Sequence, residues 1–180
     1  MFIAADESFP QRLSQEGLTR DGGVVYAIGQ LALIVSRVSG THLEKSASYE
    51  SVLAKANKVA IANPDLAPYG KAAVQYLKAA KLWDGVKGKL VFGENISETA
   101  QYVSSGNADA GFVALSLVLS PRLKDKGRWV EVPPSLYSPI LQSAVLTTQG
   151  GPNRAARRYL EFLTGSEARA IFALYGYGTP

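Results

Sequence analysis

The sequence predicts an α/β fold of two lobes, and two observations support this. Short apolar segments alternate with amphipathic segments in the order strand, helix, strand, helix, strand between residues 58 and 116. The 180 residues are 47% hydrophobic and 19% charged, which is the composition of a globular chain that buries a core. We therefore expect an α/β architecture with parallel strands and helices packed on the sheet.

The N-terminal third predicts strands and short helices. "MFIAAD" is short and apolar, and Asp6 or Ser8 can begin a helix that Gly17 ends. "VVYAIGQLALIVS" at 24–36 is rich in β-forming residues, and Gly29 predicts a bend between two strand segments. "SASYESVLAKAN" begins with hydroxyl-bearing residues that can cap a helix.

The middle of the chain carries the strongest pattern. "KVAIA" is a continuous apolar run of the kind expected in a parallel strand covered on both faces. The helix predicted in "YGKAAVQYLKAAKLWD" has one apolar face, formed by Ala72, Ala73, Tyr76, Leu77 and Ala80. "KLVF", "ISETAQYVSSG" and "AGFVALS" then predict strand, helix and strand. This order predicts right-handed crossovers.

The C-terminal segment predicts two helices. "NRAARRYLEFL" has Asn153 as its N-cap, an exposed arginine face, and an inner face of Ala156, Tyr159, Leu160 and Leu163. "GSEARAIFALYGYG" has Ser166 as its cap and ends at Gly176.

The order of elements predicts how the chain divides. We expect residues 36–142 to form one α/β lobe and 1–34 to pair with 144–180 in the first lobe, which the resemblance described below implies to be incomplete. Strand-like crossings near 30–35 and 139–145 would join the lobes, with a ligand in the cleft between them.

Several function classes are disfavoured. The chain has no cysteine, and its net charge of +4 comes from scattered basic residues rather than a dense patch, so we expect no thiolate metal site and no nucleic-acid partner. His42 is the single histidine and no GxSxG motif accompanies it, so we interpret it as a surface loop residue. Asp109 could pair with Glu94, but "GNADAG" favours a turn role. We expect no enzyme activity, no metal and no cofactor.

Two loop-to-helix junctions are the candidate site. Pro68, Tyr69 and Gly70 open one helix, and Asn95 precedes Glu98 by three residues at the start of another, close to a capping box. A helix start carries unpaired N–H groups and partial positive charge, which attract anions. Both helices follow predicted parallel strands, so their amides can point into one hollow. Most capped helix starts bind nothing, so the spacing alone is weak support.

The same residues carry a resemblance to a known family. "NPDLAPYGKAAVQYLKAAKLWDGVKGKLVFGENISETAQYVSSGNADAGFVALS" and "FLTGSEARAIFALYGYGTP" resemble the periplasmic molybdate-binding proteins of ABC transporters, which are type II periplasmic binding proteins. "FIAADESFPQRLSQEGL" and "VVYAIGQLALIV" match in order, so the resemblance covers essentially the whole chain.

The resemblance implies a two-lobed periplasmic-binding-protein-like α/β fold with a parallel-type sheet in each lobe. It also implies a substrate-binding protein that holds a tetrahedral oxyanion, molybdate or tungstate, and delivers it to a membrane permease. The family's amide donors in this lobe fall on Tyr69 and Ile96, and Ala114 stands where some members have a tyrosine. A periplasmic location follows from the family. The alternatives are a binding protein or sensor module for another anion, such as sulfate or a small organic anion.

The N-terminus departs from the family pattern. "MFIAADESFPQRL" has no signal peptide, and Met1 falls just before the family's third strand, so its ligand-binding serines have no counterpart here. We therefore expect a truncated form with weakened binding. We also expect a monomer whose exposed edge at "FIAA" could associate.

Overall fold

The computed structural model describes residues 1–38 and 48–180, and the predicted α/β class is confirmed. The chain divides into two compact units. Unit 1 is Met1–Gly29 with Ile140–Pro180, and unit 2 is Gln30–Pro139. The boundaries expected at 34–36 and 142–144 lie a few residues C-terminal to these observed boundaries. The difference arises because the whole strand at 31–36 pairs within unit 2 and the whole strand at 140–145 pairs within unit 1.

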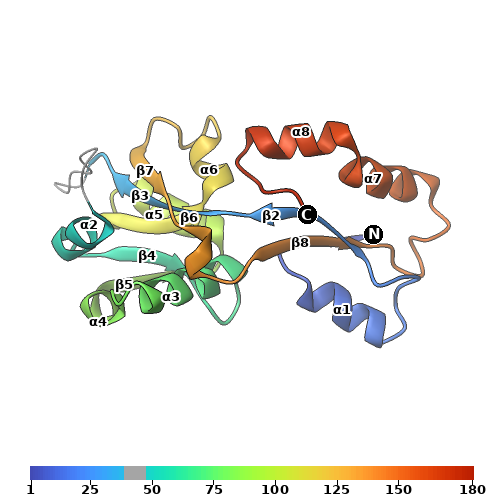
Figure 1. Cartoon of the computed structure of the whole chain (residues 1–180), viewed down its shortest axis with the longest axis horizontal. Coiled ribbons are helices and arrows are strands. Elements are labelled where there is room, and N and C mark those ends of the chain that lie inside the picture. Colours follow the sequence, from blue (N-terminus) through green and yellow to red (C-terminus); the bar gives the residue numbers. More distant parts are fainter. Residues whose placement is uncertain (39–47) are drawn as a thin grey trace. The chain divides into compact units, whose positions relative to one another are not determined.

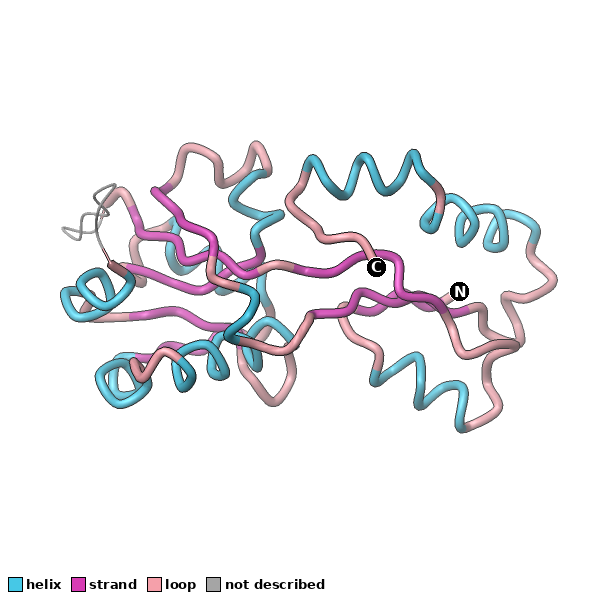
Figure 2. Tube along the Cα trace, viewed as in Figure 1, coloured by secondary structure: helices cyan, strands magenta, loops and turns pink. Residues whose placement is uncertain are grey.

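Figure 1 labels the elements and Figure 2 shows helices, strands and loops along the trace. The strands are β1 (Phe2–Ala4), β2 (Val24–Gly29), β3 (Leu31–Ser36), β4 (Val59–Ala62), β5 (Leu90–Gly93), β6 (Ala110–Ala114), β7 (Gly127–Glu131) and β8 (Ile140–Val145). The α-helices are α1 (Ser8–Gln15), α2 (Tyr49–Lys55), α3 (Pro68–Ala79), α4 (Trp83–Val86), α5 (Ile96–Ser104), α6 (Leu115–Leu119), α7 (Arg154–Thr164) and α8 (Ser166–Leu174). Single 3₁₀ turns cover η1 (Lys87–Lys89) and η2 (Pro134–Leu136).

The sheet of unit 1 is antiparallel, which differs from the expected parallel type. Its order is β1-β8-β2, with Phe2 opposite Val145 and Val24 opposite Ala144. The chain leaves unit 1 through β2 and returns through β8, so these neighbours run in opposite directions. β1 and β2 are both antiparallel to β8 and therefore parallel to each other, with α1 as their connection.

The helix ends of unit 1 follow local sequence signals closely. The Asn153 side chain accepts the amides of Ala155 and Ala156 at 2.9 and 3.3 Å, as predicted. The predicted cap at Ser166 is off by one residue: the extended Gly165 is the N-cap, and Ser166 is the first residue of α8. Tyr159 was expected on the inner face of α7 but is 47% exposed, because helical periodicity does not say which faces another element covers.

Unit 2 contains a five-stranded mixed sheet with the order β5-β4-β6-β3-β7. β4 is parallel to β5 and β6, while β3 is antiparallel to β6 and β7. The predicted β–α–β–α–β series is confirmed in this unit, where α3 connects β4 to β5 and α5 connects β5 to β6.

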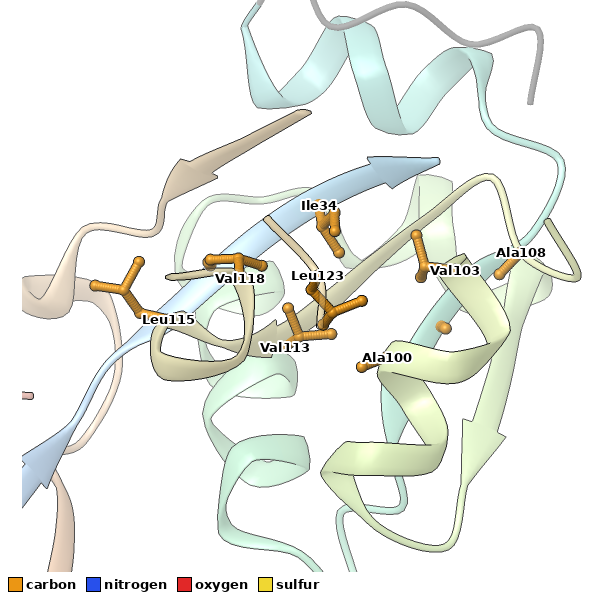
Figure 3. Packing of buried hydrophobic residues seen from close by; sticks show 10 residues of the cluster. Ile34, Ala100, Val103, Ala108, Val113, Leu115, Val118 and Leu123 are labelled. Atoms are coloured by element: carbon orange, nitrogen blue, oxygen red, sulfur yellow. The ribbon is translucent and has the colours of Figure 1, made fainter. Parts of the chain in front are cut away.

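One core cluster of unit 2 lies between the sheet and the helices α5 and α6. Figure 3 shows Ala100 and Val103 of α5 beside Val113 of β6, with Val118 and Leu123 close by. These side chains are at most 7% exposed. α3 buries the predicted apolar face, including Tyr76 and Leu77. The buried apolar side chains of α3 and α5 thus pack these helices against the sheet. Within residues 1–38 and 48–180, no helix is long and apolar enough to span a bilayer.

Candidate functional site

The candidate site begins where two parallel strands end beside each other. Ala62 is the last residue of β4 and pairs with Gly93, the last residue of β5. One residue further on, the amide of Asn63 donates to the carbonyl oxygen of Gly93 at 2.8 Å. The loops that lead into α3 and α5 therefore leave the same edge of the sheet, where α/β proteins generally bind ligands.

The start of α5 is organised by Asn95, as the spacing predicted. Its Oδ1 accepts the amides of Ser97 and Glu98 at 3.0 and 2.9 Å. The carboxylate of Glu98 folds back and accepts the amide of Glu94 at 2.7 Å, one residue before the usual capping-box position. Ile96 is the first helical residue, and its amide lies outside this set of cap bonds.

The start of α3 is organised by Asn63, which sequence reasoning missed. The carbonyl oxygen of Asn63 accepts the amides of Leu66 and Ala67 at 3.1 and 2.8 Å, and its Oδ1 accepts that of Asp65 at 3.0 Å. This turn delivers the chain to Pro68, the first residue of α3. The only local signal was an Asn-Pro pair directly after a buried strand, which favours a turn but names no site.

Tyr69 and Ile96, the predicted donor residues, lie at similar but not identical positions in the two helices. Tyr69 is the second residue of α3 and is 5% exposed, and Ile96 is the first residue of α5 and is half-buried. Both lie in first turns that follow neighbouring strand ends. Helix first turns present backbone N–H groups and the positive end of the helix dipole, so this edge is suited to an anion.

A third strand reaches the same edge without adding a polar side chain. β6 is parallel to β4 and ends at Ala114, which is 3% exposed. Ala114 offers a methyl group where a tyrosine would offer a hydroxyl. The end of β6 therefore adds no side-chain hydroxyl to this edge.

Asp109, another candidate residue, is separated from this edge. Asp109 precedes β6, at the opposite end of the strands from Glu94, so the two carboxylates form no pair. The Oδ2 of Asp109 instead accepts the amides of Asn57 and Lys58 at 2.7 and 3.0 Å, which is the predicted turn role. His42 lies outside the described residues. Within the described ranges no group of three or more acidic or histidine side chains is placed to hold a metal ion.

A two-unit α/β chain with paired helix starts at one sheet edge has the features of a solute-binding protein. The chain belongs to the bacterial extracellular solute-binding protein family, which matches residues 1–178.

Relatives within this family are close. The molybdate-binding protein ModA of Azotobacter vinelandii is 40% identical over 99% of this chain and 70% of its own length. ModA of Rhodobacter capsulatus is 38% identical over 99% of this chain and 69% of its own. The solved periplasmic molybdate-binding protein of Azotobacter vinelandii superposes with a TM-score of 0.85 at 33% identity, covering 99% of this chain and 78% of that one. The predicted resemblance and fold are confirmed.

Proposed function

We propose that this protein is the substrate-binding component of a molybdate or tungstate ABC transporter, which binds its oxyanion and catalyses no reaction. The observation that carries the proposal is the pair of helix first turns at the ends of β4 and β5, joined by the bond from Asn63 to Gly93. It occurs in a chain that is 40% identical to a molybdate-binding protein.

The proposed ligand donors in unit 2 are the backbone amides of Tyr69 and Ile96. Fixed neutral donors suit a small dianion, because they select it by geometry and number of hydrogen bonds while avoiding a counter-charge that would slow its release. Metal and cofactor have no part in this scheme.

Two amides alone do not account for tight binding. A hydrogen bond to a charged group contributes about 1.5–3 kcal/mol, so two contribute about 3–6 kcal/mol. Association costs about 4–15 kcal/mol in lost freedom of motion. Binding through Tyr69 and Ile96 alone is therefore millimolar or weaker, and tighter binding requires further donors.

The partners follow from the same role. We propose delivery of the anion to a membrane permease, a periplasmic location, and no nucleic-acid partner. We propose a monomer that can associate through the edge strand β1. Phe2 and Ile3 of this strand are 36% and 43% exposed, and its three residues include no charged side chain that would oppose pairing with another strand.

Calorimetric titration of residues 1–180 with molybdate, tungstate and sulfate tests the proposal. We expect molybdate and tungstate to compete for one site and sulfate, a smaller anion, to bind more weakly. Preference for sulfate or a small organic anion would favour the alternative ligand class. A submicromolar constant for this polypeptide would contradict binding through two amides alone.

A further inference from the structure

We propose that Gly70 and Gly93 are positioning residues of the oxyanion site, a role that rests on the function proposed above. Each glycine allows a helix first turn to lie directly against the end of a strand. A Cβ atom at either position would displace the donor amide beside it. Gly70 follows Tyr69 in α3, and Gly93 ends β5 three residues before Ile96.

Gly70 has no room for a side chain. A Cβ built on it lies 2.1 Å from the carbonyl oxygen of Ala62, 2.8 Å from the carbonyl carbon of Ala62, and 3.0 Å from that of Asn63. All three are backbone atoms at the end of β4, so they cannot rotate away. The first turn of α3 would have to retreat by about 1 Å or more to reach ordinary contact distances. The amide of Tyr69 would move with it.

Gly93 is crowded in a similar way by the first turn of α5. Its Cβ would lie 2.7 Å from Oγ1 and 2.8 Å from the amide nitrogen of Thr99, and 3.1 Å from the carbonyl oxygen of Asn95. Thr99 is fully buried, and both its amide and its hydroxyl donate to that carbonyl oxygen at 3.1 and 2.9 Å. This tight turn includes Ile96. A displacement of the turn away from β5 therefore changes the direction of the Ile96 amide.

Space, rather than backbone conformation, explains both glycines. Among the glycines of residues 1–38 and 48–180, those with positive φ are Gly17, Gly23, Gly106 and Gly176, so neither Gly70 nor Gly93 needs the left-handed region. Glycine inside a helix is less favourable than alanine, because it loses more conformational freedom on folding. The helix α3 accepts this cost at Gly70, in its first turn, where close approach to β4 sets the position of Tyr69. Hydrogen bonds to anions are short, at about 2.7–2.9 Å, so a displacement of this size disrupts them.

Two other glycines of unit 2 provide matched controls. A Cβ at Gly111 in β6 would lie 2.6 Å from Cγ2 of Val103 and 3.0 Å from the oxygen of Ala60, so it crowds the core. Val103 is seven residues after Ile96, about 10 Å further along α5. Gly85 has nothing within 4 Å of its Cβ. Gly111→Ala reports on crowding alone, and Gly85→Ala on loss of glycine alone.

The experiment compares Gly70→Ala, Gly93→Ala, Gly111→Ala and Gly85→Ala in the full chain of residues 1–180 by amide NMR and thermal unfolding. We expect the Tyr69 resonance to shift in Gly70→Ala and the Ile96 resonance in Gly93→Ala, with neither shifted in the controls. In titrations with sodium molybdate followed on these resonances, Kd should rise at least tenfold in the first two variants. It should stay within about twofold in Gly85→Ala and Gly111→Ala, even though Gly111→Ala unfolds at a lower temperature.

The outcomes separate this inference from the proposed function. Unshifted Tyr69 and Ile96 resonances in the Gly70 and Gly93 variants overturn the inference, whether or not molybdate binds. Equal loss of affinity in Gly111→Ala also overturns it, because general destabilisation would then suffice. If the parent chain does not bind molybdate but the resonances shift as expected, the positioning role stands and the proposed ligand is wrong. If Gly70→Ala does not fold, Gly93→Ala carries the test.

Discussion

The amide of Asn63 donates to the carbonyl oxygen of Gly93 at 2.8 Å, which joins the loops after β4 and β5 although the two residues are far apart in sequence. Asn63 also closes the turn before α3, and Gly93 lies under the first turn of α5. The positions of the two helix starts are therefore coupled through one backbone hydrogen bond. We propose that this coupling preorganises the amides of Tyr69 and Ile96 as a pair of donors, in place of two independent helix ends.

The variant Asn95→Asp tests whether the anion binds at the start of α5. Aspartate caps a helix as well as asparagine does, so the amides of Ser97 and Glu98 keep their acceptor. The added negative charge lies one residue from Ile96 and repels a dianion. Two unit charges 4 Å apart interact by about 1 kcal/mol in water and about 4 kcal/mol near a protein surface. We expect molybdate Kd to rise at least tenfold in calorimetry at low salt, with a smaller change at high salt.

Asn153→Asp is the control for this variant. Asn153 caps α7 in unit 1 through the same side-chain bonds to two amides. The substitution Asn153→Asp adds the same charge to the protein as Asn95→Asp does, but residue 153 belongs to unit 1. Equal losses of affinity in Asn95→Asp and Asn153→Asp would mean that net charge, and not proximity to Ile96, controls binding.

The variant Asp109→Ala tests the structural role of this carboxylate. The substitution removes the carboxylate that accepts the amides of Asn57 and Lys58. These two hydrogen bonds hold the segment before β4 against the turn before β6. We expect the free energy of unfolding to fall by about 1–3 kcal/mol in urea denaturation. Asp109→Asn keeps an acceptor oxygen and should lose less. Molybdate affinity of the folded variants should not change, since Asp109 lies at the opposite end of the strands from Tyr69 and Ile96. A large affinity loss would assign Asp109 to the site.

The stability of unit 1 should depend on the ionisation of Tyr26. Burial raises the pKa of Tyr26 from 10.0 to about 12, with smaller contributions from Tyr177 and Tyr159. The folded state holds this proton more tightly than the unfolded state. Its contribution to stability is therefore complete below pH 10.0 and is lost as the pH rises toward about 12. Denaturation at increasing pH should show a steeper loss of stability in the parent than in Tyr26→Phe. Identical curves would contradict the raised pKa.

Sequence patterns were reliable where the relevant atoms are close in the chain. The cap at Asn95 and its partner Glu98 were predicted from a three-residue spacing, because capping bonds join neighbouring residues. The strands β4, β5 and β6 and the helices α3 and α5 followed from the period of their apolar positions. The predicted strand "AGFVALS" was too long, because α6 begins at Leu115. The candidate donors Tyr69 and Ile96 came from family resemblance, and their roles stay predictions.

Contacts between distant residues were not predictable in the same way. Asn63, Gly70 and Gly93 show their importance only once β4 and β5 lie side by side. The antiparallel direction of the sheet in unit 1 depends on how the chain leaves and re-enters that unit. Tyr159 lies on the predicted side of its helix yet is half exposed, because coverage depends on neighbouring elements.

The sequence by itself determined most of the elements, the helix caps at Asn95 and Asn153, and the family, since these depend on local hydrogen bonds, on periodic burial and on residue identity. Tertiary structure alone decided how closely the two predicted helix starts approach the strand ends, and therefore that glycine is required where each first turn meets a strand. The physical reason is that excluded volume between backbones acts across space, so it has no signature in the spacing of residues along the chain.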